Sequence, residues 1–160
     1  MNLKNEFIKI NAINKINDFQ KNSKILVYSG GGVGVSTKEL KKEKKTYRVI
    51  KISEKEGDPF SRLDSVPKAY IDCYPWSDVY TPEVYAQVFY TESRLCVFFK
   101  ACEPRITATY LNMNDPVYKD SCVEFFFNPN PEKDRRYINL EMNPFGTFLI
   151  MIGEDRNNRP

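Results

Sequence analysis

Short apolar stretches follow one another from Tyr47 onward, and the segments between them are rich in residues that favour turns. Apolar and polar side chains alternate in most of the stretches with the period of two of a β-strand. The intervening residues 91–94, 128–134 and 143–146 hold Asn, Pro, Asp, Ser or Gly, which suit tight turns. The predicted strands cover residues 47–52, 69–74, 84–90, 95–101, 122–127, 136–142 and 147–152. This succession predicts an all-β fold, an antiparallel β-sandwich.

The first third of the chain differs from the rest in charge. Residues 1–57 hold 13 Lys and Arg against 6 Asp and Glu, whereas residues 58–160 hold 11 against 15. We therefore expect residues 1–46 to form a basic, Lys- and Asn-rich, less ordered segment. The β-sandwich domain is expected at residues 47–160.

Within the N-terminal segment, loosely spaced apolar side chains between residues 2 and 24 predict a short amphipathic helix, and residues 25–28 predict a strand. Residues 29–37 then read SGGGVGVST, which resembles the P-loop of the partitioning ATPases, K-G-G-V-G-K-[ST]. Gly30 and Val35 stand where that loop carries its two lysines, so the charge that neutralises phosphate is missing. We expect a flexible loop or hairpin turn here and no nucleotide site.

The sequence contains no histidine, which excludes Ser-His-Asp and Cys-His nucleophiles as well as His-ligated zinc or haem. A formal net charge of +3 does not indicate a nucleic-acid partner. No stretch approaches the ~20 apolar residues of a membrane span, and no secretory signal is visible. The four cysteines lie in or beside apolar runs and are expected to be reduced, buried thiols. These features predict a cytoplasmic protein without nucleic-acid or membrane partners, or a secreted one if an export signal was removed.

Chemistry-bearing side chains concentrate on two of the predicted strands. The alternation of residues 122–127 and 136–142 places Glu124, Asn139 and Glu141 on the sheet face opposite the core, with Asn143 at its end. Carboxylates and amides bind sugar hydroxyls, and aromatic rings such as Tyr137 and Phe126 stack on sugar C–H faces. The pattern favours a sugar-binding surface, and an ordinary solvated sheet face is the alternative. Two neighbouring acids would also suit Ca²⁺, although no specific motif supports a cofactor.

The runs NDPVYKDSCVEFF (residues 114–126), YINLEMN (residues 137–143) and Gly146-Thr147 resemble the family 9 carbohydrate-binding modules and their DOMON-like relatives. The resemblance covers about residues 60–160. It implies an antiparallel β-sandwich that binds the ends of sugar chains between aromatic side chains. Such modules accompany xylanases and related hydrolases.

Carried over by position, the resemblance implies that Glu124 is the ligand-binding acid and that Tyr118 is an aromatic clamp residue. Tyr118 replaces the more usual tryptophan. Arg136 and Asn139 match polar contacts to the sugar. The chain ends at Pro160, where the family continues with further strands and a second clamp aromatic. We therefore expect a sandwich that lacks its last strands and self-associates through an exposed sheet edge.

The sole tryptophan, Trp76, lies among prolines and polar residues and is expected in a loop, either stacking on sugar or packing across the sandwich edge. The leading hypothesis is a non-catalytic domain that binds oligosaccharides or polysaccharides of the plant type and serves xylan or glycan catabolism. A glycoside-processing enzyme would use Glu124 and Glu141 as acid and base. A haem- or redox-binding DOMON-type domain is disfavoured by the missing histidine. A structural interaction domain would dock a partner through its basic N-terminal segment.

Overall fold

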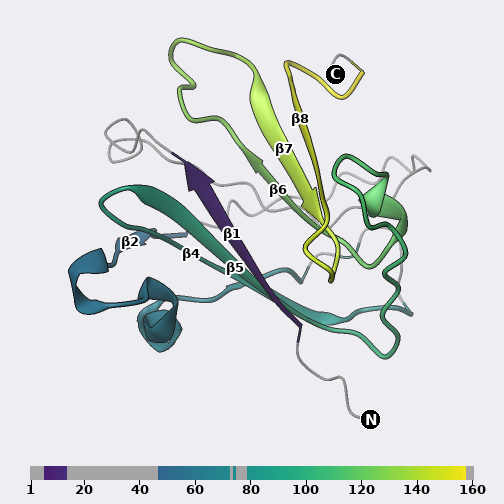
Figure 1. Cartoon of the computed structure of the whole chain (residues 1–160), viewed down its shortest axis with the longest axis horizontal. Helices are drawn as coiled ribbons and strands as arrows, with labels where there is room; N and C mark the ends of the chain where they lie inside the picture. Colours follow the sequence, from purple (N-terminus) through teal and green to yellow (C-terminus); the bar gives the residue numbers. More distant parts are fainter. Residues whose placement is uncertain (1–5, 14–46, 73, 75–78, 158–160) are drawn as a thin grey trace.

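The computed structural model describes residues 6–13, 47–72, 74 and 79–157, which form two β-sheets that enclose one core (Figure 1). The strands are β1 (Glu6–Ile13), β2 (Ile50–Lys51), β3 (Ala69–Tyr70), β4 (Glu83–Tyr90), β5 (Arg94–Cys102), β6 (Val123–Phe127), β7 (Tyr137–Met142) and β8 (Phe148–Gly153). Short 3-10 helices accompany them, among them η2 (Glu54–Glu56), η3 (Pro59–Ser65) and η4 (Val117–Lys119). The predicted antiparallel β-sandwich is confirmed.

The larger sheet has the order β1-β5-β4-β2, and β3 also pairs with β4. A tight turn joins β4 to β5, closed by a 2.8 Å hydrogen bond from Thr91 N to Arg94 O. Ala86 and Val88 of β4 point into the core between the sheets, whereas Phe89 packs on the other face against residues near η3. Because both faces of β4 and β5 are covered, these strands read as nearly continuous apolar runs.

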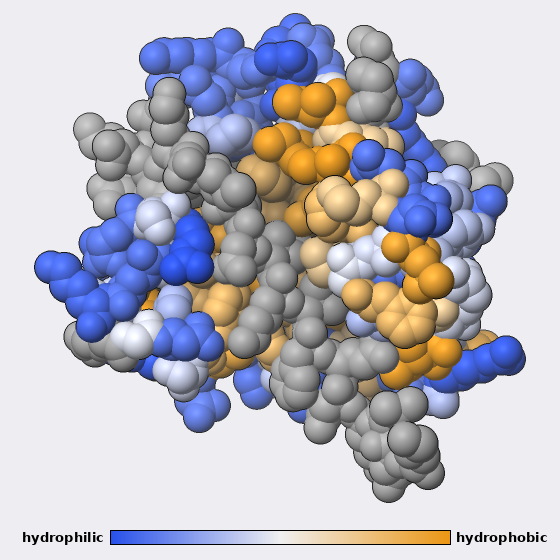
Figure 2. Space-filling model, viewed as in Figure 1, coloured by the Kyte–Doolittle hydropathy of each residue, from blue (hydrophilic) through white to orange (hydrophobic). Residues whose placement is uncertain are grey.

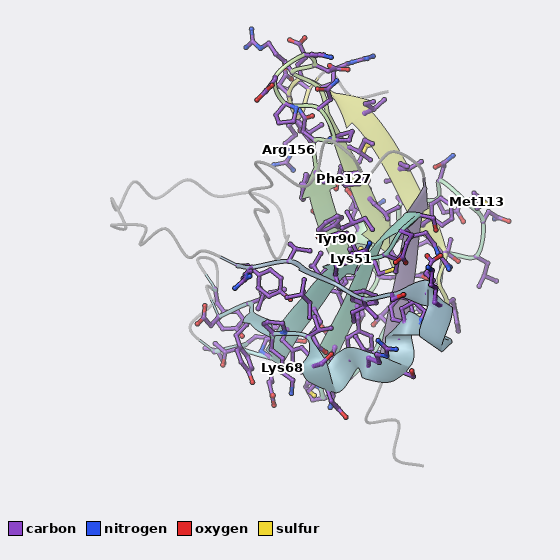
Figure 3. The ribbon with its side chains drawn as sticks, turned by 90° about the vertical axis from the view of Figure 1, so that its left-hand side faces the viewer. Lys51, Lys68, Tyr90, Met113, Phe127 and Arg156 are labelled. Atoms are coloured by element: carbon purple, nitrogen blue, oxygen red, sulfur yellow. The ribbon has the colours of Figure 1, made fainter. Side chains whose placement is uncertain are left out.

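The helix η3 is attached to the outer face of this sheet through one buried amide. Gln87 is only 3% exposed, and its Nε2 donates hydrogen bonds of 2.7 Å to the carbonyl oxygens of Leu63 and Val66. Figure 3 shows the same sheet from the side, with Lys51 of β2 close to Tyr90 of β4, its partner in the parallel pairing. The second half of β4 therefore holds both η3, through Gln87, and β2, through the parallel pairing.

The smaller sheet, β6-β7-β8, contributes Phe125, Leu140 and Met142 to the shared core. The turn between β7 and β8 is organised by Asn143, whose Oδ1 accepts hydrogen bonds from the backbone N–H groups of Phe145 and Thr147. Ile150 and Ile152 of β8 remain 49% and 43% exposed. Figure 2 shows apolar surface in the region of β8, the strand that carries these two exposed isoleucines.

Five of the predicted strands agree with β4 to β8 to within about one residue at most ends. The strands expected at 47–52 and 69–74 are shorter, because β2 and β3 each comprise two residues on the edge of β4. The connection between β2 and β3 contains η2 and η3.

The amphipathic helix predicted between residues 2 and 24 is wrong over residues 6–13, which form β1. This strand pairs antiparallel with β5 along its whole length, from Glu6 opposite Ala101 to Ile13 opposite Arg94. The stretch EFIKINAI also alternates, and its β-branched isoleucines and its asparagine are weak helix formers. Hydrogen bonds to the open edge of β5 therefore outweigh a helix that had little propensity of its own. The expectations for residues 25–45, including the glycine-rich loop, and for Trp76 lie outside the described residues.

Within the described ranges, no helix has the length and apolar character needed to cross a membrane.

Candidate functional site

A pocket of about 310 Å³ opens beside the start of β6. Its walls come from the segment after β5, from η4 with the turn that follows it, and from the residues just before β4. Figure 1 shows η4 as the short green helix on this side of the molecule. The lining comprises two tyrosines, Tyr80 and Tyr118; three acids, Glu103, Asp120 and Glu124; two cations, Arg105 and Lys119; and Thr107, Ser121 and Cys122.

The turn after η4 is fixed to the segment after β5 by reciprocal hydrogen bonds. Ser121 N donates to Thr107 O at 2.8 Å, and Thr107 N donates to Ser121 Oγ at 3.0 Å. The Ser121 hydroxyl in turn donates to Glu103 Oε2 at 2.7 Å. Two walls of the pocket are thereby held to each other by short polar contacts.

Asp120 is occupied by donors from the protein itself. It accepts hydrogen bonds from Thr109 N and Oγ1, from Tyr110 N at 3.1 Å and from Asn143 Nδ2 at 2.9 Å. Burial opposes its ionisation, but the hydrogen bonds from Asn143, Thr109 and Tyr110 prevail and lower the pKa of Asp120 to about 2. Asp120 is therefore a charged structural anchor of the pocket wall.

The two tyrosines present much of their surface to solvent. Tyr118 is 56% exposed, and the Lys119 Nζ lies 5.9 Å from the centroid of its ring. Tyr80 is 47% exposed. Burial of its hydroxyl, together with a hydrogen bond to the Glu103 carboxylate, raises the pKa of Tyr80 to about 12. The pocket thus combines aromatic surface with polar groups, the combination that sugars require.

Glu124 is the residue of the predicted polar face that reaches the pocket. It lies directly opposite Glu141 of β7, so their Cβ atoms are ~5 Å apart on the same sheet face. Glu141 is only 4% exposed and accepts a 2.7 Å hydrogen bond from Asn139 Nδ2. Asn139 is 1% exposed, and among the described residues its Oδ1 has no hydrogen-bond partner. The strand pairing places these three residues on one sheet face, as the alternation predicts, but Asn139 and Glu141 are buried and do not line the pocket.

The arrangement of the acids bears on two alternatives raised by the sequence. The pair considered for a glycosidase, Glu124 and Glu141, does not face the pocket together, because Glu141 does not line it. For Ca²⁺, the part of the chain that the structure describes holds no group of three or more His, Cys, Asp or Glu side chains suited to a metal ion.

Arg136, the remaining predicted contact, lies elsewhere. It is exposed in the connection between β6 and β7, and its Nη2 contacts Asp134 Oδ2 at 2.7 Å. Sequence reasoning also did not find Tyr80, Glu103, Arg105 or Ser121 as pocket residues. They lie in irregular connections, where no periodic pattern indicates the direction of a side chain.

Comparison with known proteins agrees with the fold. Residues 60–160 match the model of carbohydrate-binding family 9. A crystal structure from Bacteroides uniformis ATCC 8492, described as that of a candidate carbohydrate-binding protein, shares 30% sequence identity and superposes with a TM-score of 0.57. The match covers 70% of this chain and 54% of that one. No curated protein matches the chain at a significant level. The chain therefore belongs to carbohydrate-binding family 9, a family of non-catalytic carbohydrate-binding modules.

Proposed function

We propose that this domain binds oligosaccharides of the plant-polysaccharide type in the pocket beside β6, without cleaving them. The observation that carries the proposal is the meeting of Tyr118 and Glu124 in one pocket. The two residues are six positions apart and come from different elements, η4 and β6. An exposed ring offers a stacking surface for sugar C–H groups, and a carboxylate accepts hydrogen bonds from sugar hydroxyls.

The charge distribution supports a polar ligand. Asp120 is occupied by protein donors, and Glu103 accepts from Ser121. Arg105 and Lys119 form no ion pair within the described ranges, so their N–H groups are available to hydroxyl or carboxylate oxygens of a ligand. Donors, an acceptor and aromatic surface then converge on one volume, as a sugar-binding site requires.

The test is titration calorimetry of the purified chain with xylotriose, cellotriose and trigalacturonate. We expect binding of at least one sugar, with Kd weakened about tenfold in Tyr118→Ala and in Glu124→Gln. Tyr70→Ala is the matched control for the tyrosine, because Tyr70 is also 56% exposed but lies on β3, away from the pocket. Glu83→Gln, at the exposed start of β4, is the control for the acid.

Absence of binding to all three sugars would contradict the proposal. Equal losses in Tyr70→Ala and Tyr118→Ala would place the sugar elsewhere on the surface.

A further inference from the structure

A second, smaller cavity of about 40 Å³ adjoins the pocket beside β6. The two share Glu103, Ser121 and Cys122 as lining residues, so they meet just before the start of β6. The other described residues that line the smaller cavity are all apolar: Phe99 and Ala101 of β5, Ile106, Val123 of β6, and Pro144. An apolar cavity therefore lies next to a pocket whose own lining is mainly polar.

The polar residues that both cavities share are already engaged with the protein. Ser121 Oγ donates a hydrogen bond of 2.7 Å to Glu103 Oε2, and the Glu103 carboxylate also accepts one from the Tyr80 hydroxyl. Ser121 N donates to Thr107 O at 2.8 Å. These contacts fix the place where the two cavities meet, and the smaller cavity beyond it presents mainly carbon to a ligand.

This lining determines which substituent of a sugar suits the smaller cavity. A hydroxyl group would exchange water for surroundings that are mainly carbon, which costs free energy unless a new hydrogen bond replaces the one to water. A carboxylate would in addition meet the carboxylate of Glu103. Burial of a methyl group is favourable, because it removes apolar surface from water. The smaller cavity therefore favours a neutral substituent that ends in a methyl group.

The volume of the smaller cavity indicates the size of that substituent. A water molecule needs about 10–15 Å³ of cavity, so about three non-hydrogen atoms fit into it. An O-acetyl group adds two carbons and one oxygen to a sugar hydroxyl. Its carbonyl oxygen needs a hydrogen-bond donor, and Arg105, which lines the larger pocket directly before Ile106, carries guanidinium N–H groups.

We infer that this domain binds an O-acetylated sugar, whose ring occupies the pocket beside β6 and whose acetyl group enters the smaller apolar cavity. The inference rests on the proposed sugar binding at the same pocket. It adds the chemical class of the ligand, an acetyl ester, and the place where the ester is recognised, next to Ala101 and Ile106.

Calorimetric titration of the whole chain tests the inference by comparing xylotriose and cellotriose with derivatives that carry one O-acetyl group, at O2 or at O3. We expect at least one of these derivatives to bind about fivefold more tightly than its unsubstituted parent, because its methyl group becomes buried. The corresponding O-butyryl derivative is longer by two carbons and should bind no better than the parent, because it exceeds the cavity. A larger gain from O-butyryl than from O-acetyl would overturn the inference, since an open apolar surface would then bind the substituent.

A substitution that fills the smaller cavity provides the second test. Ala101→Val adds two carbon atoms to a side chain that lines this cavity. We expect the variant to lose the roughly fivefold preference for the acetylated sugar, while its Kd for the unsubstituted sugar changes less than about twofold. Ala69→Val is the matched control, because Ala69 is also half-buried but lies on β3 and lines neither cavity. Circular dichroism thermal melts establish that both variants are folded.

The outcomes separate this inference from the proposed function. Binding of xylotriose or cellotriose with no gain from an acetyl group at either position would overturn the inference and leave sugar binding intact. A preference for the acetylated sugar that persists at full strength in Ala101→Val would overturn the assigned place of the acetyl group. Absence of binding to every sugar, substituted or unsubstituted, would overturn both proposals.

Discussion

Asn143 donates a hydrogen bond from Nδ2 to Asp120 Oδ2, 2.9 Å away, and thereby joins the turn after β7 to the turn that follows Tyr118. The same Nδ2 donates to Tyr110 O at 2.8 Å, and Asn143 is fully buried. The pocket wall is therefore held by a buried amide and by a carboxylate that accepts hydrogen bonds from the protein itself. Its shape depends on these buried polar contacts as much as on the core.

Asp120→Asn is expected to destabilise the domain by about 1–3 kcal/mol, because hydrogen bonds to a charged acceptor are replaced by weaker ones to a neutral amide. The pKa of Asp120 is lowered to about 2 in the folded protein, so its stabilising contribution is present above the ordinary carboxyl pKa near 4. That contribution is lost as the pH falls from about 4 to about 2. Urea denaturation at pH 6, 4 and 3 measures both effects.

Comparing the wild type with Asp120→Asn separates the contribution of Asp120 to acid sensitivity from those of the other acids. Asp134 and Glu92 also have pKa values lowered to about 2, so the wild type loses stability in acid for several reasons. The difference in unfolding free energy between wild type and Asp120→Asn should shrink as the pH falls below 4. A difference that stays constant across this range would contradict the assigned role.

Cys122 should be much less reactive than Cys102 toward iodoacetamide at pH 8. Burial, with the negative charges of Glu124 and Glu141, raises the pKa of the Cys122 thiol to about 12, whereas Cys102 is exposed. Since the thiolate is the reactive form, Cys122 should be alkylated slowly. In Glu124→Gln the loss of one charge should lower the Cys122 pKa and accelerate its alkylation, while Cys102 serves as the internal reference. Peptide mass spectrometry measures both alkylation rates. An unchanged Cys122 rate in Glu124→Gln would show that the charge of Glu124 does not raise the pKa of Cys122.

Most of the sheet structure was predictable because it depends on local patterns. The alternation in β6 and β7 correctly put Phe125 and Leu140 in the core and Glu124 and Glu141 on the other face. Side-chain direction in a strand follows from its period of two, so a strand that is identified also assigns its faces.

Two classes of feature were not predictable in this way. The pairing of β1 with β5 joins segments about 90 residues apart, and such long-range pairing overrode a weak local helical pattern. The pocket walls are irregular connections such as the one that carries Glu103, and only the hydrogen bonds of Ser121 and Asp120 fix where they point. Of the residues that the resemblance implies, Tyr118 and Glu124 line the pocket, whereas Arg136 does not.

Gln87→Leu should destabilise the attachment of η3 by about 2 kcal/mol. The substitution fills a similar volume but removes the donor that satisfies the carbonyl oxygens of Leu63 and Val66, both at 2.7 Å. Relative to the wild type, hydrogen exchange of the backbone amides should accelerate more in residues 59–66 than in β7. Gln87→Glu should be at least as harmful, because it also buries a charge. Uniformly faster exchange in all strands would show instead that the whole sandwich depends on Gln87.

Substitutions of Glu124 and Glu141 should have different effects on sugar binding and on stability, although the two residues lie opposite each other on neighbouring strands. Glu124 lines the pocket, so Glu124→Gln should weaken sugar binding about tenfold with little change in stability. Glu141 is 4% exposed and bound to Asn139 Nδ2, so Glu141→Gln should alter the unfolding midpoint while Kd changes less than about threefold. Calorimetric titration and urea denaturation of both variants measure the two effects, with Glu83→Gln as the reference. A larger loss of affinity in Glu141→Gln than in Glu124→Gln would mean that the ligand enters from the buried side of this sheet face.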